Sequence, residues 1–351
     1  MKIKLAMLES DSNYLKRIVP IFNNKFANEL EIYSFTDVDA AMQCLSEKGI
    51  DVFLASHSFK IDFTLIPKKC GFAYLVDSLD IERIDSHKAI CKYQKAELIY
   101  KQVLSLYSEQ VPNITGIART ENGAMKTIAF ISPCGGVGTS TSAAACAISL
   151  ANSGYRVLYI NAEVYGSADM FFSCDGQFDF GDVIYAVKSN KTNRAMKLQS
   201  TVKQDVSGVS YYSSVRVPLD MMEMNSEDYI ILQNEFKMLG CYDYVIMDMD
   251  YPKVLSEFKF LQHCNSIVLV ANDSDECTQK VEKALRAIQI LDDQSEYALQ
   301  PRMWLLQNKF GANAFVQHDI RVLGTIPIYQ QIPPAQMAKQ ISTSDIFGQL
   351  I

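Results

Sequence analysis

Residues 131–141 read Ile-Ser-Pro-Cys-Gly-Gly-Val-Gly-Thr-Ser-Thr and lie between an apolar run and a segment rich in alanine. Residues 127–132 predict a short buried strand, and residues 140–151 predict a helix. The three glycines allow successive backbone N–H groups to turn inward, and the helix N-terminus adds a partial positive charge. Strand, glycine loop and helix together therefore predict a phosphate-binding loop (P-loop).

The loop departs from the common pattern G-x-x-x-x-G-K-[ST], because Pro133 replaces the first glycine and Thr139 replaces the lysine. It resembles more closely the variant loop x-K-G-G-x-G-K-[ST] of the MinD/ParA family, although Cys134 and Thr139 occupy both lysine positions. The resemblance implies that ATP is bound by Gly135, Gly136, Val137, Gly138, Thr139, Ser140 and Thr141. A glycine-rich turn without a ligand is the alternative, and later landmarks in the chain argue against it.

A second landmark is the sequence Tyr-Asp-Tyr-Val-Ile-Met-Asp at residues 242–248. An apolar strand that ends in a carboxylate is typical of a Walker B strand, in which the acid meets Mg²⁺ at the strand's C-terminal end. The resemblance implies that Ser140 and Asp248 hold Mg²⁺. A buried strand that ends in aspartate by chance is the alternative, which the preceding loop makes the weaker interpretation.

Two further segments fall where the MinD/ParA family has functional residues. Asn161-Ala-Glu163 replaces the family's Asp-x-Asp, so Glu163 is the candidate catalytic residue, with a simple strand cap as the alternative. Asn308-Lys309 replaces an Asn-Arg pair whose asparagine reads the adenine edge, and Pro327 ends a Gly-x-Ile-Pro segment that packs near the base. The resemblance therefore implies nucleotide contacts from Asn308 and Pro327.

Residues 1–108 predict a smaller domain of alternating strands and helices. Its order resembles the response-regulator receiver domain, in which an aspartate ending the third strand is phosphorylated. Ser56 stands at that position here, and a serine cannot form the acyl phosphate. Glu9, Asp11 and Lys92 match the receiver's acidic pair and lysine. Without the acceptor they are more often plain surface charges. We expect a pseudo-receiver that is not phosphorylated at Ser56. Its surface should serve protein contacts.

The expected fold class is α/β, with an N-terminal receiver-like (flavodoxin-like) doubly wound domain followed by a P-loop MinD/ParA-type parallel-sheet domain. Residues 1–108 form the first domain, 126–351 the second, and the Pro- and Gly-containing residues 109–125 the linker. This combination resembles the TadZ/CpaE branch of pilus-assembly proteins, which commonly lacks the phosphate-binding lysine.

Composition excludes several other classes of protein. The chain has 33 basic and 40 acidic residues, a net charge of −7, and scattered basic residues, which argues against a nucleic-acid partner. No apolar run reaches membrane-spanning length, and residues 1–8 lack the apolar core of a signal peptide. Nine cysteines without a C-x-x-C pair are typical of thiols in a reducing compartment. We therefore expect a cytoplasmic protein that does not insert into the membrane.

The resemblance implies an ATP- and Mg²⁺-binding localisation or scaffold protein for a Tad-type (type IV-like) pilus or secretion system, with weak or absent ATP hydrolysis. It also implies a homodimer through the ATPase domain, contacts with pilus or secretion assembly proteins, and a place at the cell pole or the inner face of the membrane. The alternative is an active ParA/MinD-type ATPase that positions plasmids, chromosomes or the division site. Both missing lysines argue against that alternative.

Overall fold

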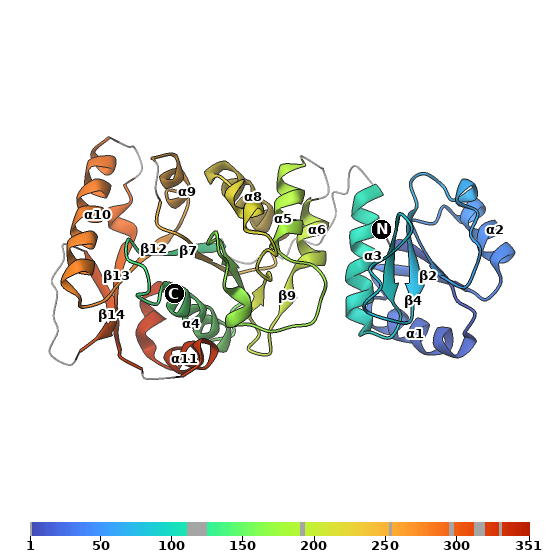
Figure 1. The fold of residues 1–351 in the computed structure, drawn as a ribbon, viewed down its shortest axis with the longest axis horizontal. Coiled ribbons are helices and arrows are strands. Elements are labelled where there is room, and N and C mark those ends of the chain that lie inside the picture. The colour runs from blue at the N-terminus through green and yellow to red at the C-terminus, as the bar shows by residue number, and fades with distance from the viewer. Residues whose placement is uncertain are drawn as a thin grey trace. The chain divides into compact units, whose positions relative to one another are not determined.

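The computed structural model describes residues 2–110, 125–189, 194–252, 255–294, 298–311, 320–329 and 332–351. The chain divides into two compact units, Met1–Gly116 with Asn190–Ser200, and Ile117–Ser189 with Thr201–Ile351; Figure 1 traces both. Most of the predicted linker, residues 111–124, lies outside the described residues. Within the described ranges, no helix is long and apolar enough to cross a membrane.

The described part of the first unit is built on a six-stranded sheet in the order β2-β1-β3-β4-β6-β5. Neighbouring strands are parallel, except that β5 and β6 are antiparallel. This order matches the 2-1-3-4-5 order of flavodoxin-like folds, which confirms the predicted doubly wound domain. The strands are β1 (Ile3–Leu8), β2 (Leu30–Phe35), β3 (Val52–Ser56), β4 (Gly71–Val76), β5 (Arg83–Ile84) and β6 (His87–Cys91).

Helices cover both faces of this sheet. Helices α1 (Ser12–Lys25) and α3 (Ala96–Gln110) pack on one face in a core that includes Phe22, Leu54 and Val103. Helix α2 (Val38–Lys48) packs on the other face in a second core. Every residue of β3 is buried, as expected for a central parallel strand covered on both sides.

The alternation of strands and helices stops after β3. Residues 57–86 are all described, and apart from β4 they contain only a 3₁₀ turn at Phe63–Leu65 and the short strand β5, with no α-helix. Pro67 explains why the turn ends, because a proline disfavours helical geometry in the residue before it. Ile66 is accordingly extended, with φ −77° and ψ 124°.

The described part of the second unit forms an eight-stranded sheet in the order β14-β13-β12-β7-β11-β8-β10-β9. Neighbouring strands are parallel except for β9 and β10, so the predicted parallel-sheet domain is confirmed. The strands are β7 (Lys126–Ile131), β8 (Val157–Asn161), β9 (Lys203–Gln204), β10 (Ser210–Tyr211), β11 (Tyr244–Asp248), β12 (Ser266–Ala271), β13 (Met303–Phe310) and β14 (Arg321–Pro327).

In Figure 1, α4 and α11 lie on one side of the second sheet, and α8, α9 and α10 lie on the other. Helix α4 contacts β7, β8, β11 and α11, and its run of buried alanines permits this close packing. The remaining described α-helices are α4 (Thr139–Asn152), α5 (Phe180–Lys188), α6 (Arg194–Thr201), α7 (Pro218–Met222), α8 (Ser226–Leu239), α9 (Phe258–Leu261), α10 (Asp275–Asp293) and α11 (Pro334–Ile341). Of these, α6 belongs to the first unit as far as Ser200.

Candidate functional site

The glycine loop lies between β7 and α4, where the sequence predicts it. Gly136 (φ 72°) and Gly138 (φ 91°) both adopt the left-handed region, which glycine enters without a steric penalty. Gly138 is the N-cap of α4 and, lacking a side chain, supplies no side-chain cap. The first N–H groups of a helix have no partner within the helix, so those of α4 are suited to an anion.

Asp248 ends β11, which is the neighbour of the loop strand β7 in the sheet. It is fully buried, and its Oδ2 accepts hydrogen bonds from the Tyr159 hydroxyl (2.8 Å) and from Asn161 Nδ2 (2.6 Å). Burial, followed by the negative charge of Glu163, raises the pKa of Asp248 to about 7. The neighbouring polar groups, including Ser140, offset this only in part.

The other carboxylate oxygen of Asp248 provides a test of whether a metal fits. Among the described residues, Oδ1 is a buried atom without a hydrogen-bond partner. A buried acceptor normally has a partner, and Mg²⁺ prefers carboxylate and other oxygen ligands. Asp248 and the hydroxyl of the nearby Ser140 therefore fit the predicted Mg²⁺ site.

Glu163 follows β8 and belongs to the same polar network. Its Oε2 accepts hydrogen bonds from Asn161 Nδ2 (3.0 Å) and from the Ser167 hydroxyl (3.2 Å). Asn161 thus links Glu163 to Asp248, because its amide nitrogen donates to both carboxylates. This holds the predicted catalytic carboxylate beside the predicted metal ligand.

A cavity of about 630 Å³ opens at this edge of the sheet, a volume within the range of small-molecule sites. Its lining includes Glu163, the exposed Asp250 and six of the seven predicted loop residues, namely Gly135, Gly136, Gly138, Thr139, Ser140 and Thr141. Val137 is buried behind the loop and does not line the cavity. The structure therefore brings the predicted loop and Glu163 to one cavity, with Asp248 buried next to them.

Asn308 and Pro327 do not line this cavity. Asn308 Nδ2 donates to the carbonyl of Val137 at 2.6 Å, so its amide holds the back of the loop. A Cβ on Gly138 would lie 2.3 Å from this nitrogen, which explains why glycine is required there. Pro327 is exposed at the end of β14 and does not line the cavity. The predicted base contacts of both residues stay predictions.

Lys309 reaches the cavity, and sequence reasoning assigned it no role. Its Nζ donates to the carbonyl of Gly136 at 2.6 Å. Its backbone is left-handed (φ 59°), an uncommon conformation for a residue with a side chain, which typically costs about 1–3 kcal/mol. The signal in the sequence is its place after Asn308, where a parallel strand approaches the C-terminal edge of the sheet.

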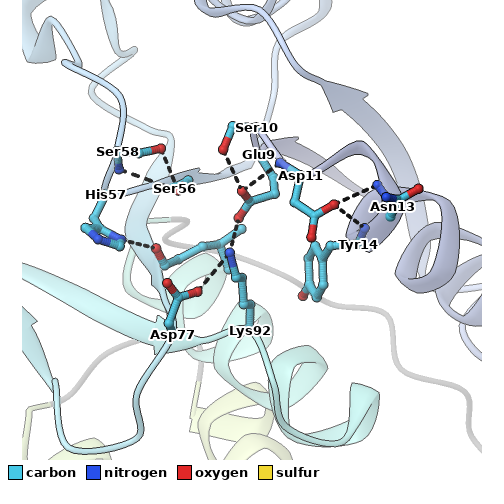
Figure 2. A network of polar contacts seen from close by, with 11 residues as sticks. Glu9, Ser10, Asp11, Asn13, Tyr14, Ser56, His57, Ser58, Asp77 and Lys92 are labelled. Carbon is cyan, nitrogen blue, oxygen red and sulfur yellow. Dashed lines mark hydrogen bonds and ion pairs between the residues drawn. The ribbon is translucent and has the colours of Figure 1, made fainter.

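The first unit has a separate polar cluster at the ends of its own strands, shown in Figure 2. Lys92 Nζ pairs with Glu9 Oε2 (3.1 Å) and with Asp77 Oδ1 (2.8 Å). The side chains of Lys92 and Glu9 are only 8% and 1% exposed, whereas that of Asp77 is 59% exposed. Burial lowers the pKa of Lys92, but the hydrogen bonds that Lys92 donates to Asp77 and Glu9 outweigh this effect, so the net pKa is raised and the ammonium stays charged. Asp77 had not been predicted.

The other receiver-like residues are engaged locally. Asp11 caps α1, because its Oδ1 accepts from the backbone N–H groups of Asn13 (2.8 Å) and Tyr14 (3.2 Å). Ser56 is buried at the end of β3, and its hydroxyl lies 3.0 Å from that of Ser58 (Figure 2). Of the three predicted residues, the structure pairs the side chains of Glu9 and Lys92, whereas Asp11 reaches Glu9 only through its backbone N–H, which donates to Glu9 Oε1 (3.1 Å).

We predict that Ser56 stays unmodified when the protein is treated with acetyl phosphate. A serine hydroxyl is a poorer nucleophile than a carboxylate in this chemistry, and burial restricts its access to the phosphodonor. Intact-mass measurement checks the prediction, and a labile phosphate mapped to Ser56 would contradict it.

Comparison with known proteins agrees with both units. A family model described as "TadZ-like, receiver domain" matches residues 1–108, and one described as "AAA domain" matches residues 125–301. The chain is similar to a solved ParA family ATPase from Chlorobium tepidum TLS, with 16% identity and a TM-score of 0.50, over 63% of this chain and 98% of that one. It is also similar to the MinC:MinD cell division protein complex of Aquifex aeolicus, with 16% identity and a TM-score of 0.50, over 64% of this chain and 95% of that one. No curated protein matches the chain.

At these identities the solved structures show the fold of the second unit, which is that of MinD/ParA ATPases. The AAA-domain match covers half of the chain, and the receiver match covers the residues before it. The order of the two matches is the order in which the sequence predicts the two domains. The chain therefore belongs to the AAA-domain family, and a TadZ-like receiver domain precedes its AAA domain.

Proposed function

We propose that the protein binds ATP together with Mg²⁺ and acts as a localisation or scaffold protein in the assembly of a Tad-type pilus or secretion system. The observation that carries this proposal is the buried Oδ1 of Asp248, which lacks a hydrogen-bond partner among the described residues. It stands on the strand next to the loop strand, and the loop's own N–H groups suit a phosphate. Asp248 and Ser140 would hold Mg²⁺, which would offset the charge of the phosphates.

Calorimetric titration with ATP tests this proposal. The wild-type protein should bind ATP more tightly with Mg²⁺ than with a chelator. Asp248→Asn keeps the shape of the side chain but removes the charge, so it should abolish the gain from Mg²⁺ and leave the metal-free affinity in place. Retained metal-free binding also shows that the variant is folded. Absence of ATP binding by the wild type, or an undiminished Mg²⁺ gain in the variant, would refute the proposal.

Hydrolysis is proposed to be weak or absent. Cys134 and Thr139 occupy both lysine positions of the variant loop. Loss of a cation that stabilises the transferred charge typically costs on the order of 10³-fold or more in rate. Glu163 is the candidate for any residual activity, because it lines the cavity and is held by Asn161 and Ser167. Phosphate release should therefore be very slow and should fall further in Glu163→Gln. An ordinary turnover number that survives this substitution would contradict the assignment.

The location is proposed to be the cytoplasmic side of the inner membrane near the cell pole, reached through assembly proteins of the pilus or secretion system. The receiver-like domain supports a role in protein contacts, because Lys92 already neutralises the strand-end acids that would otherwise attract a metal. A fluorescent fusion at native expression level should form polar foci that disperse when the other assembly proteins are deleted. Diffuse fluorescence in the wild-type cell would argue against this location.

A further inference from the structure

The phosphate loop of this chain has no cation of its own. Thr139 stands in the first turn of α4, and Cys134 is buried with its thiol directed to the carbonyl of Cys277 (3.7 Å). Neither side chain can offset the charge of a phosphate group. Among the described residues that line the cavity, Lys309 is the sole lysine or arginine.

Lys309 comes from a different part of the chain, the end of β13, and still touches the loop. Its Nζ lies 2.6 Å from the carbonyl oxygen of Gly136, in the middle of the glycine run. An ammonium group has three donors, and one is used here, so two remain for a ligand in the cavity. Within the described structure, no carboxylate pairs with Lys309, and its charge is therefore available to an anion.

The position of Lys309 is fixed by its neighbour. Asn308 Nδ2 donates to the carbonyl of Val137 (2.6 Å), and Asn308 Oδ1 accepts from the backbone N–H of Lys309 (3.0 Å). These two hydrogen bonds hold the end of β13 against the loop and fix the backbone next to Lys309, which is in the left-handed conformation. The lysine and the loop thus form one assembled unit before any ligand binds.

We propose that Lys309 is the phosphate-binding cation of this site and replaces, from β13, the lysines that the loop lacks. The proposal rests on the proposed function, because it assigns a residue to the nucleotide's phosphate chain. A purely structural lysine that only caps Gly136 would stabilise the loop equally for every ligand. A phosphate-binding lysine instead favours ligands in proportion to their negative charge, and its effect is screened by salt.

Displacement of a fluorescent nucleotide by ATP, ADP and AMP tests the proposal on the full chain. Lys309→Met should weaken ATP binding about 10- to 100-fold, as expected for loss of a hydrogen bond between charged groups, with a smaller loss for AMP. The variant should also show a weaker dependence of ATP affinity on salt concentration. Lys309→Arg retains the charge and should recover most of the affinity for ATP.

Lys280→Met provides the matched control. Lys280 lies near the same loop, since its charge acts on Cys134, but it pairs with Glu276 (2.5 Å) and does not line the cavity. Lys280→Met changes the net charge by the same amount as Lys309→Met. It should leave the affinities for ATP, ADP and AMP within about twofold of wild type. An equal loss in both variants would show a general charge effect and overturn the proposal.

Two other outcomes would also overturn it. Lys309→Met could lower the affinities for ATP, ADP and AMP by the same factor and leave their salt dependence unchanged. That result would indicate a lysine that only caps the Gly136 carbonyl. It could also leave ATP affinity unchanged; if the wild type binds ATP in the same assay, this result removes only the role of Lys309. Failure of the wild type to bind ATP would instead overturn the proposed function, and the role of Lys309 with it.

Discussion

The two left-handed glycines of the phosphate loop differ in their surroundings. A Cβ on Gly136 would meet nothing within 4 Å, whereas a Cβ on Gly138 would lie 2.3 Å from Asn308 Nδ2. Gly136→Ala should therefore cost only the left-handed backbone penalty, about 1–2 kcal/mol. Gly138→Ala should cost about 1 kcal/mol more, because Asn308 must also leave the carbonyl of Val137. Urea denaturation without nucleotide measures both, and equal losses would contradict the close approach of Asn308.

The buried charge of Lys92 gives a second prediction at the scale of single residues. Lys92→Met would leave Glu9 buried without a counter-charge, and such a change typically costs about 3–5 kcal/mol. Adding Glu9→Gln should restore part of this loss, because it removes the unpaired charge. The exposed pair Lys25–Glu97 is the control, and Lys25→Met should cost less than about 1 kcal/mol. Denaturant unfolding of the full chain measures all three variants, and a loss as small as the control's would contradict the buried pair.

Residues whose role depends on a local pattern could be predicted at this scale, and residues placed by distant contacts could not. The glycine loop is recognisable because turn, strand and helix are adjacent in sequence. Asp77 also ends an apolar strand, but its pairing with Lys92 depends on β4 lying next to β6 in the sheet, which no local pattern indicates. Lys309 likewise depends on a contact between residues 173 positions apart. The candidate Mg²⁺ ligand Asp248 stands out in the sequence because an acid at the end of an apolar strand is a local pattern.

At the scale of elements, the length of a helix decides whether it can be recognised in the sequence. The helix Val38–Lys48 has both of its ends marked in the sequence, because Asp37 caps its start and Gly49 ends it in the left-handed conformation (φ 59°). The short helices α6, α7 and α9 were not predicted, since one or two turns give little periodicity to detect. Tertiary packing, which sequence periodicity does not report, sustains helices of this length.

The pair Arg156–Asp243 joins the start of β8 to the start of β11. Asp243 Oδ2 accepts from the backbone N–H of Arg156 (2.8 Å), and its Oδ1 accepts from the guanidinium (2.6 Å). These hydrogen bonds lower the pKa of Asp243, so the folded state holds the proton less tightly than the unfolded state does. The stabilisation is therefore present above the unfolded pKa of about 4 and is lost as the pH falls through the lower folded pKa.

Asp243→Asn should accordingly destabilise the protein by about 1 kcal/mol near neutral pH, a value limited by the partial exposure of both side chains. The difference from wild type should shrink below about pH 4. Thermal unfolding across this pH range measures it. Glu276→Gln, in an exposed pair on one helix, is the control and should leave stability nearly unchanged across the same pH range. A difference that stays constant down to pH 3 would show that the ion pair is not its origin.

At the scale of the whole molecule, we predict a two-fold homodimer through the AAA domain. The phosphate cavity is open at the edge of the sheet, and a second copy would cover it with a self-complementary surface. Because Cys134 stands at a lysine position of the variant loop and supplies no charge that could reach a nucleotide held by the second copy, the dimer should depend little on ATP. Light scattering with and without ATP and Mg²⁺ checks this. A monomer at tens of micromolar in both conditions would exclude the dimer, and a strictly ATP-gated dimer would exclude the role given to Cys134.

The position of β7 in its sheet also determines when the protein can fold during synthesis. Its two partners, β11 and β12, follow it by well over 100 residues, whereas all strands of the first sheet lie within residues 3–91. At the usual translation speed of about 5–20 residues per second, β7 leaves the ribosome roughly 6–25 s before either partner. During that interval the apolar segment Thr-Ile-Ala-Phe-Ile has both edges unpaired and can join the same segment of another nascent chain. Slower translation initiation should therefore raise the soluble yield, because fewer nascent chains expose this segment of the second unit at the same time.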